Sequence, residues 1–167
     1  MSQVISPNFS KPDAKTRNLI QRMRRFDLLD RIELIENTFN KIVFKTRFSL
    51  ADQVLLHALI SSRANVRIVS LIDLQSASST VQSLIGITKD LYGLALEGNA
   101  LSNVDLVLAV DGMNEDGTEF IQSNPFDTAH RINPLADWSQ EQLIDYVLAH
   151  EVPVNPDDMP GVSKHAA

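Results

Sequence analysis

Residues 42–59 constrain the fold more than any other part of the chain. They join a short apolar run, typical of a strand buried on both faces, to an amphipathic helical pattern through a brief polar turn. In an α/β protein, the free N–H groups and positive dipole of such a helix start favour an anion at the end of the strand. The pattern therefore predicts a phosphate or nucleotide site in the turn at residues 46–52.

The same alternation of strand and helix recurs along the chain. Apolar, β-branched runs at residues 65–73 and 104–110 predict two more strands, and residues 50–61 and 79–92 predict helices, the second closed by Gly93. Ser139 with Gln142 forms a capping box for a helix through about residue 149. Alternating elements imply parallel pairing and right-handed crossovers, so we expect an α/β fold with helices on both faces of a parallel sheet.

The remaining segments set the domain organisation. Residues 1–10 are predicted to form a flexible arm, residues 11–152 a single α/β domain, and residues 153–167 an irregular C-terminal tail. Within the domain, one apolar stripe predicts either one long helix or two short ones at its N-terminal end: Leu19, Met23, Phe26, Leu29, Ile32, Ile35 and Phe39. Residues 111–131 are acidic, contain glycine and proline, and are expected to form a loop.

Composition excludes several functional classes. None of the 167 residues is a cysteine, which removes disulfides, thiolate metal sites and cysteine-based catalysis. The four histidines are scattered, so we expect no metal site and no cofactor. The net charge of −6 disfavours a nucleic-acid partner. The sequence shows no candidate membrane span or signal peptide, and we expect a cytoplasmic protein.

The charge is unevenly distributed along the chain. Basic residues crowd the first stretch: Lys11, Lys15, Arg17, Arg22, Arg24, Arg25 and Arg31. Two interpretations stay open, a solvated helix face and a surface that docks a protein partner, the latter through Lys11, Arg17, Arg22, Arg24 and Arg25. A homodimer is also open.

Three segments, in order, resemble the sulfonucleotide reductases, and most closely the phosphoadenosine phosphosulfate reductase family. Residues 43–57, VFKTRFSLADQVLLH, are similar to the family pattern V-F-x-T-S-F-G-x-E-D-Q-V-L-L-H. Residues 68–93 resemble the strand, D-T-G-R loop and helix that follow it. Residues 132–139, INPLADWS, and 151–156, EVPVNP, resemble V-N-P-L-A-D-W-T and x-V-P-Y-N-P. The resemblance implies a shortened, adenine-nucleotide α-hydrolase-like (HUP-like) fold.

The chain departs from that pattern at positions where the family has its binding and catalytic residues. Arg47, Ser49 and Ala51 stand where the family has serine, glycine and glutamate, and of the D-T-G-R loop only Asp73 is retained. Acidic residues replace an arginine-rich stretch after the later strand, and the family's reducing cysteine has no counterpart. That mechanism needs a thiolate to attack sulfur and a thiol to resolve the adduct. We therefore expect no catalytic residues for this reaction.

The candidate site residues each admit a second interpretation. The turn is either a remnant nucleotide or anion pocket or a helix start whose own side chains satisfy its N–H groups, and its candidates are Thr46, Arg47, Phe48, Ser49 and Asp52. Asp73 either binds a ribose or caps the next turn.

Three functional hypotheses follow from these residues. The leading one is a reductase-like pseudoenzyme, linked to sulfate assimilation, that binds an adenine nucleotide, sulfate or phosphate, or acts as an accessory module. The second is an enzyme for another adenylated or sulfated nucleotide, with Arg47 and Thr46 holding phosphate. The third is an interaction module that docks through its basic N-terminal helix.

Overall fold

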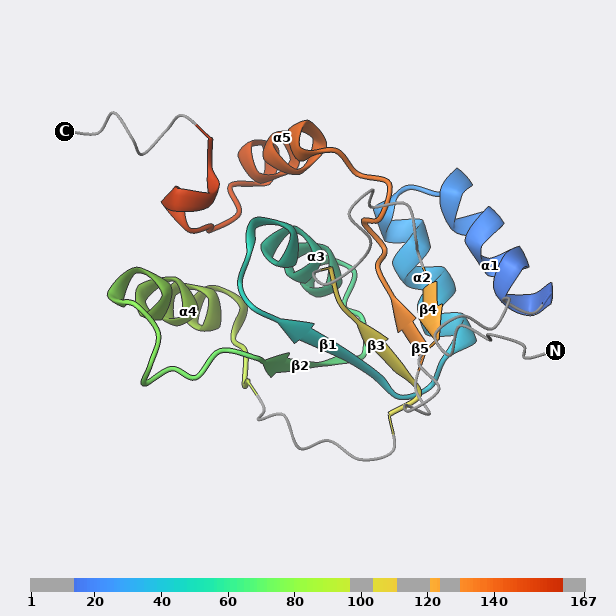
Figure 1. Ribbon diagram of the computed structural model, residues 1–167, viewed down its shortest axis with the longest axis horizontal. Helices are drawn as coiled ribbons and strands as arrows, with labels where there is room; N and C mark the ends of the chain where they lie inside the picture. Colours follow the sequence, from blue (N-terminus) through green and yellow to red (C-terminus); the bar gives the residue numbers. More distant parts are fainter. Residues whose placement is uncertain (1–13, 97–103, 111–120, 124–129, 161–167) are drawn as a thin grey trace, which may run out of the picture.

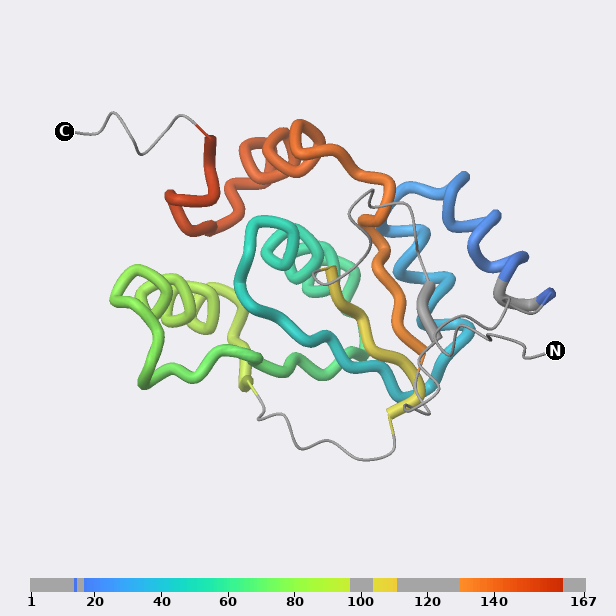
Figure 2. Tube along the Cα trace, viewed as in Figure 1, coloured from blue at the N-terminus to red at the C-terminus, as the bar shows by residue number. Residues whose placement is uncertain are grey.

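The computed structural model describes residues 14–96, 104–110, 121–123 and 130–160 (Figures 1 and 2). The elements in chain order are α1 (Ala14–Arg25), α2 (Leu28–Thr38), β1 (Ile42–Thr46), α3 (Leu50–Ser61), β2 (Val66–Ser70), α4 (Ser79–Tyr92), β3 (Leu106–Leu108), β4 (Ile121–Ser123), β5 (His130–Ile132), α5 (Gln140–His150) and a short 3-10 helix, η1 (Pro156–Asp158). The bounds of α3 and α4 are those that the hydrophobic pattern predicts.

The strands form one sheet in the order β2-β1-β3-β5-β4. Strands β2, β1, β3 and β5 are parallel, and β4 runs antiparallel to β5 at the edge. The parallel α/β class expected from the sequence is confirmed. The loop expected at residues 111–131 is wrong in part, because β4 and the start of β5 lie within it. Strand β3 is equally short but lies in the apolar run at residues 104–110, whereas β4 and the start of β5 lie in a stretch without such a run.

The N-terminal apolar stripe forms two helices, not one. The chain breaks at Asp27, whose carboxylate accepts the N–H of Asp30 as the N-cap of α2. The break rotates α2 relative to the stripe, so Leu28 is buried while Leu29, expected in the core, is 50% exposed.

One large core joins the sheet to helices α1, α2, α3 and α5. Its residues in β1 and β3 alternate along the strands, as a buried sheet face requires, and are Ile42, Phe44, Leu106 and Leu108. Strands β2 and β5 add Ile68 and Ile132. Helix α3 is buried around most of its circumference and not along a single stripe, because it lies among the sheet, α2 and α5. Burial of each such aliphatic side chain stabilises the fold by about 1.5–3 kcal/mol.

Helix α4 lies beside α3, at the β2 end of the sheet, whereas α1 and α2 lie at the β4–β5 end (Figure 1). Gly93 closes α4 in the left-handed conformation, with φ of 63°, as expected for a helix C-cap. Leu84 and Ile85 of α4 form a second, smaller core with Phe48, the residue that follows β1 by two positions. Helix α4 is thereby tied to the turn after β1.

The segment after α5 packs against the main core. Val152 is buried, and Val154 and Met159 pack partly against the main core. Among the described residues, no helix is both long enough and apolar enough to cross a bilayer.

Candidate functional site

The carboxyl end of β1 lies at the switch point of the sheet. Chain connectivity runs from β1 through α3 to β2 on one side, while β3 pairs with β1 on the other side. Ligands of open α/β sheets bind outside the carboxyl ends of the strands at such a point. The candidate turn at residues 47–49 follows β1 there and leads directly into α3.

The turn binds its own backbone amides. The Asp52 carboxylate Oδ2 accepts the N–H of Arg47 at 2.8 Å and that of Ser49 at 3.3 Å, and the Thr46 hydroxyl accepts the N–H of Phe48 at 2.9 Å. Ser49 Oγ accepts the N–H of Asp52 at 3.2 Å, which completes a capping box. Asp52 is fully buried. Its carboxylate is therefore a built-in anion at the positive end of α3.

Phe48 fixes the shape of the turn. Its φ is 61°, in the left-handed region that a bulky residue rarely adopts, at a cost on the order of 1–3 kcal/mol. The side chain is 2% exposed and packs on Leu84 and Ile85, and this burial offsets the strain. Within the turn, Arg47 is exposed and Ser49 is half-buried. Arg47 is therefore the exposed charged residue of this turn.

Asp73 lies in the exposed segment after β2. Its carboxylate Oδ1 accepts the N–H of Gln75 at 3.1 Å, and its carbonyl accepts the N–H of Ser76. These are the contacts of a turn cap. The backbone joins the two candidate loops, since the N–H of Leu71 donates to the Thr46 carbonyl at 2.9 Å.

Gln53, in the first turn of α3, is a buried polar residue that the candidate residues do not include. It is fully buried, and its Nε2 donates to Thr88 Oγ1 at 3.0 Å and to the Pro153 carbonyl at 2.9 Å. Thr88 in turn donates to the Leu84 carbonyl. Gln53 thus joins α3 to α4 and to the segment after α5. The available signal was its match to the glutamine of the family pattern that residues 43–57 resemble.

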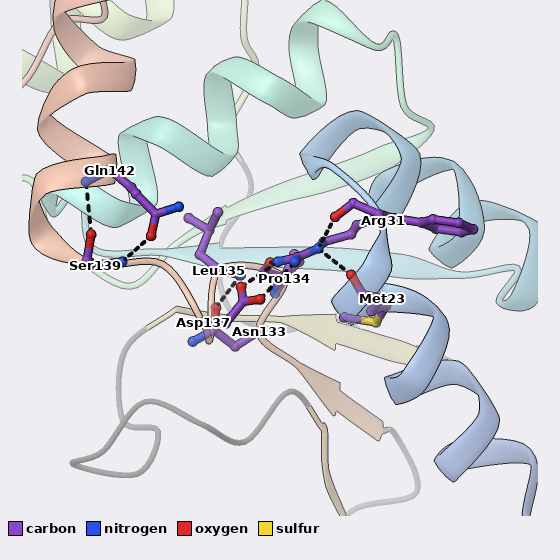
Figure 3. Close-up of polar contacts among 9 residues, drawn as sticks. Met23, Arg31, Asn133, Pro134, Leu135, Asp137, Ser139 and Gln142 are labelled. Atoms are coloured by element: carbon purple, nitrogen blue, oxygen red, sulfur yellow. Dashed lines mark hydrogen bonds and ion pairs between the residues drawn. The ribbon is translucent and has the colours of Figure 1, made fainter.

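The segment 133–138 is held from both ends (Figure 3). Asn133 Oδ1 accepts the N–H of Leu135 at 2.9 Å, which forms the turn, and Ser139 with Gln142 caps α5 as the sequence predicts. Asp137 forms a two-pronged ion pair with Arg31, with N···O distances of 2.7 and 2.9 Å. Such paired geometry is the strongest form of the arginine–carboxylate contact.

Arg31 is a structural residue and not part of an exposed basic face. Its side chain is 5% exposed. Its guanidinium also donates to the backbone carbonyls of Met23, Phe26 and Pro134. Figure 3 shows the guanidinium between the end of α1 and the segment 133–138. Charge along the sequence could not separate Arg31 from its exposed neighbours, because the distinction depends on a partner 106 positions away.

An aromatic cluster joins α3, α4 and α5. His57 Nδ1 lies 2.7 Å from the Tyr146 hydroxyl, and the His57 ring lies 5.1 Å from that of His150 and 6.3 Å from that of Tyr92. Burial, and then the nearby His150, lower the pKa of His57. Burial, and then Tyr92, raise the pKa of Tyr146 to about 12. Both shifts favour the neutral forms of His57 and Tyr146 at neutral pH.

The described part of the chain contains no group of three or more histidine, aspartate or glutamate side chains placed to hold a metal ion. Lys11 of the basic stretch lies outside the described residues.

The chain is similar to two curated bacterial enzymes. It is 26% identical to an adenosine 5′-phosphosulfate reductase of Rhizobium meliloti, over 81% of this chain and 67% of that protein. It is 24% identical to the enzyme of the same name from Sinorhizobium fredii, over 86% of this chain and 74% of that protein. No protein-family model matches the chain.

Solved structures support the fold assignment. The phosphoadenylyl-sulfate reductase of Candida auris, solved as a phosphate complex, superposes with a TM-score of 0.74 at 16% identity, over 89% of this chain and 91% of that chain. Yeast FAD synthetase in complex with FAD superposes with a TM-score of 0.56 at 17% identity, over 89% of this chain and 64% of that chain. The HUP-like α/β class expected from the sequence is confirmed. Sequence and fold together relate this chain to the phosphoadenosine phosphosulfate reductase family.

Proposed function

We propose that this protein is a reductase-like binding module of sulfur metabolism that takes an adenine nucleotide, or its phosphate or sulfate group, without carrying out thiol-dependent reduction. The observation that carries the proposal is a strand-turn-helix junction with an exposed arginine, Arg47, at the switch point of a reductase-like sheet, in a sequence without cysteine. The solved reductase that shares the fold was crystallised with phosphate, and the FAD synthetase with an adenine-containing ligand. Both support a ligand of this chemistry.

The chemistry of reduction sets the limit on activity. Reduction of a sulfated nucleotide through a covalent adduct needs a thiolate nucleophile and a second thiol to release the reduced product. These 167 residues supply neither. The proposed role therefore stops at binding, with no bond formed or broken by this chain.

The geometry predicts weak binding. Arg47 is exposed beside the positive end of α3, and a guanidinium can donate two hydrogen bonds to a phosphate or sulfate. The amides of residues 47–49, in contrast, already donate to Asp52 and Thr46, and the Asp52 carboxylate repels a second anion. We expect a dissociation constant of about 0.1–1 mM, or about 4–5.5 kcal/mol of binding free energy.

Calorimetric titration and amide chemical shifts test this proposal with adenosine 5′-phosphosulfate, ADP, phosphate and sulfate. We expect saturable binding of the nucleotides, with shifts centred on residues 46–52, and about tenfold weaker binding by Arg47→Ala. Arg63→Ala is the matched control, because Arg63 is also exposed but follows the far end of α3, roughly 18 Å away along the helix.

Two results would contradict the proposal. One is the absence of heat and of shifts with every ligand in the set. The other is sustained sulfite release from adenosine 5′-phosphosulfate or its 3′-phosphorylated form in the presence of thioredoxin, which would restore a catalytic role.

A further inference from the structure

Two histidines that are distant in the sequence lie beside each other where α3 and α5 pack together (Figure 1). His57 lies one turn before Ser61, the last residue of α3, and His150 is the last residue of α5. The centroids of the two imidazole rings are 5.1 Å apart, and the rings are inclined by 40°. His57 is half-buried and His150 is exposed, so the pair is open to solvent on one side.

The Tyr146 hydroxyl fixes which nitrogen of His57 is available. It lies 2.7 Å from His57 Nδ1, and Ser61 Oγ lies 3.5 Å from the same nitrogen. In the described part of the chain, no hydrogen bond involves Nε2. When Nδ1–H donates to the tyrosine oxygen, the lone pair of the ring lies on Nε2. Metal-binding histidines adopt such a tautomer, with a neighbouring acceptor holding their other nitrogen.

The separation of the two rings matches a metal ion held between them. A metal–imidazole bond is about 2.0–2.1 Å long, so the ion lies roughly 3.2 Å from the centre of each ring. Two imidazoles on one ion then have centroids about 5.2 Å apart at a tetrahedral angle and about 4.5 Å apart at a right angle. The observed 5.1 Å lies within this range. Because His150 is exposed, its ring can turn about its side-chain torsions to direct a nitrogen toward that point.

The electrostatic surroundings favour a cation at this point. Burial, and then the nearby His150, lower the pKa of His57, so the neutral form that binds metals predominates at neutral pH. The other ionisable rings in contact with His57 are Tyr92 of α4 and Tyr146 of α5, and burial raises the pKa of both phenols. They are therefore uncharged at neutral pH. Both histidines also lie close to the carboxyl ends of their helices, where the helix dipole is negative.

We propose that His57 Nε2 and a ring nitrogen of His150 bind one late first-row dication, Cu²⁺, Ni²⁺ or Zn²⁺. The described residues form no group of three histidine, aspartate or glutamate ligands, so water completes the coordination. Imidazole nitrogen suits these ions, whereas Mg²⁺ and Ca²⁺ prefer oxygen ligands. Tyr146 is a positioning residue, because it holds the His57 ring and does not itself bind the ion. The bound ion joins α3 to α5.

Calorimetric titration of the full chain with CuCl₂, NiCl₂ and ZnCl₂ at about pH 7.5 tests the proposal, with MgCl₂ as the negative control. We expect one ion per chain, with a dissociation constant on the order of 1–10 µM for Cu²⁺ and weaker binding of Ni²⁺ and Zn²⁺. The electron paramagnetic resonance spectrum of the Cu²⁺ complex should show coupling to two imidazole nitrogens. At an ion concentration about 100 times the dissociation constant, the melting temperature should rise by about 5 °C.

Ligand and positioning residues should differ in their effects. His57→Gln and His150→Gln each remove one nitrogen ligand, so each should weaken Cu²⁺ binding at least about thirtyfold and leave coupling to one nitrogen. Tyr146→Phe retains both ligands but loses the hydroxyl that orients His57. It should weaken binding by about tenfold, and its spectrum should still show two nitrogens.

His130→Gln is the matched control, because His130 is also exposed but lies on β5 against Phe39. His165→Gln is the control for the histidine outside the described residues, and both control variants should bind Cu²⁺ as the unmodified chain does. Circular dichroism shows whether each variant is folded. If His57→Gln does not fold, His150→Gln decides the test, because it changes an exposed side chain.

Several results would overturn the proposal. They are the absence of heat with all three ions up to about 1 mM, unchanged affinity in His150→Gln or in folded His57→Gln, and an equal loss of affinity in a control variant. Binding of Mg²⁺ as tight as that of Cu²⁺ would also overturn it, because it would indicate oxygen ligands. The experiment is independent of nucleotide binding, since neither histidine belongs to the turn at residues 46–52.

Discussion

Replacement of Arg31 by methionine is the most informative single perturbation of this fold. The guanidinium donates to the carbonyls of Met23, Phe26 and Pro134 and pairs with both oxygens of Asp137. A methionine side chain fills much of the volume of the aliphatic part of Arg31 but donates no hydrogen bond. The Met23 carbonyl keeps the N–H of Phe26 as a donor, whereas the Phe26 and Pro134 carbonyls lose the donor described here.

The loss of stability in Arg31→Met follows from the polar groups that are left without a hydrogen-bond partner. Two carbonyls lose their donor, at about 1–3 kcal/mol each, and the partly exposed Asp137 loses its cation, so we expect a total cost of about 3–5 kcal/mol. The loss extends to the contact between α1, α2 and the segment 133–138. In a domain of this size, each kcal/mol lowers the melting temperature by about 2–4 °C, so we expect Arg31→Met to melt roughly 6–20 °C lower.

Asp137→Asn, which changes the other partner of the ion pair, should destabilise the fold less than Arg31→Met. Asp137 is 40% exposed, so water replaces part of what Asp137→Asn removes, and Arg31 keeps its carbonyl acceptors. We expect a loss of about 1–2 kcal/mol for Asp137→Asn. Arg25→Met on the exposed side of α1 is the matched control and should stay within about 0.5 kcal/mol of the unmodified chain.

Urea unfolding followed by circular dichroism measures all three variants. A cost below about 1 kcal/mol for Arg31→Met would refute the reasoning, since it would mean that the buried carbonyls are satisfied without the guanidinium. Equal costs for Arg31→Met and Asp137→Asn would also refute it, because the carbonyl contacts would then contribute nothing.

Further predictions concern backbone conformation and pH. Gly93 and Glu151 both close helices with positive φ, of 63° and 53°. In urea unfolding, Gly93→Ala should therefore destabilise the fold by about 1 kcal/mol, while Glu151→Gly should be neutral or stabilise it by about a few tenths of a kcal/mol. Effects of the same sign for both variants would contradict the left-handed conformation of these two residues. Because burial and then His150 lower the pKa of His57, the unfolded chain binds its proton first, and stability should decline as the pH falls through about 6.5. His57→Gln should flatten that decline, and an unchanged slope would exclude His57 as its source. At alkaline pH the raised pKa of Tyr146, about 12, acts in the opposite direction, so stability should fall above about pH 10 and Tyr146→Phe should reduce the fall.

The candidate site shows how a scaffold and its chemistry can separate. The strand, turn and helix lie where a ligand is expected in this class of fold. The side chains of Asp52 and Thr46, however, accept hydrogen bonds from the backbone amides that would otherwise face an anion. A ligand therefore has two possible binding modes. It either binds through hydrogen bonds from Arg47 and the positive end of the α3 dipole alone, or it displaces the Asp52 carboxylate from its contacts with the amides. Comparison of Asp52→Asn with the unmodified chain in the nucleotide titration distinguishes these two modes.

Elements whose signals are local could be predicted from the sequence. The bounds of α3 and α4, the capping box at Ser139 and Gln142, and the Gly93 cap were all predictable, because hydrophobic period, caps and left-handed positions are written within a few consecutive residues. The order of motifs along the chain likewise indicated the reductase-like fold before any contact was known.

Tertiary structure alone decided which polar side chains face inward. Arg31 reads as one more surface cation until Asp137 is brought beside it, and Gln53 reads as a solvated amide until α4 and Pro153 close around it. Strands β4 and β5 are defined by their pairing, since the sequence around them has no apolar run that predicts a strand. For the turn at residues 46–52, the sequence left open whether its amides face a ligand or its own side chains. Only the fold, by placing Asp52 Oδ2 within 2.8 Å of the Arg47 amide, decided in favour of the latter.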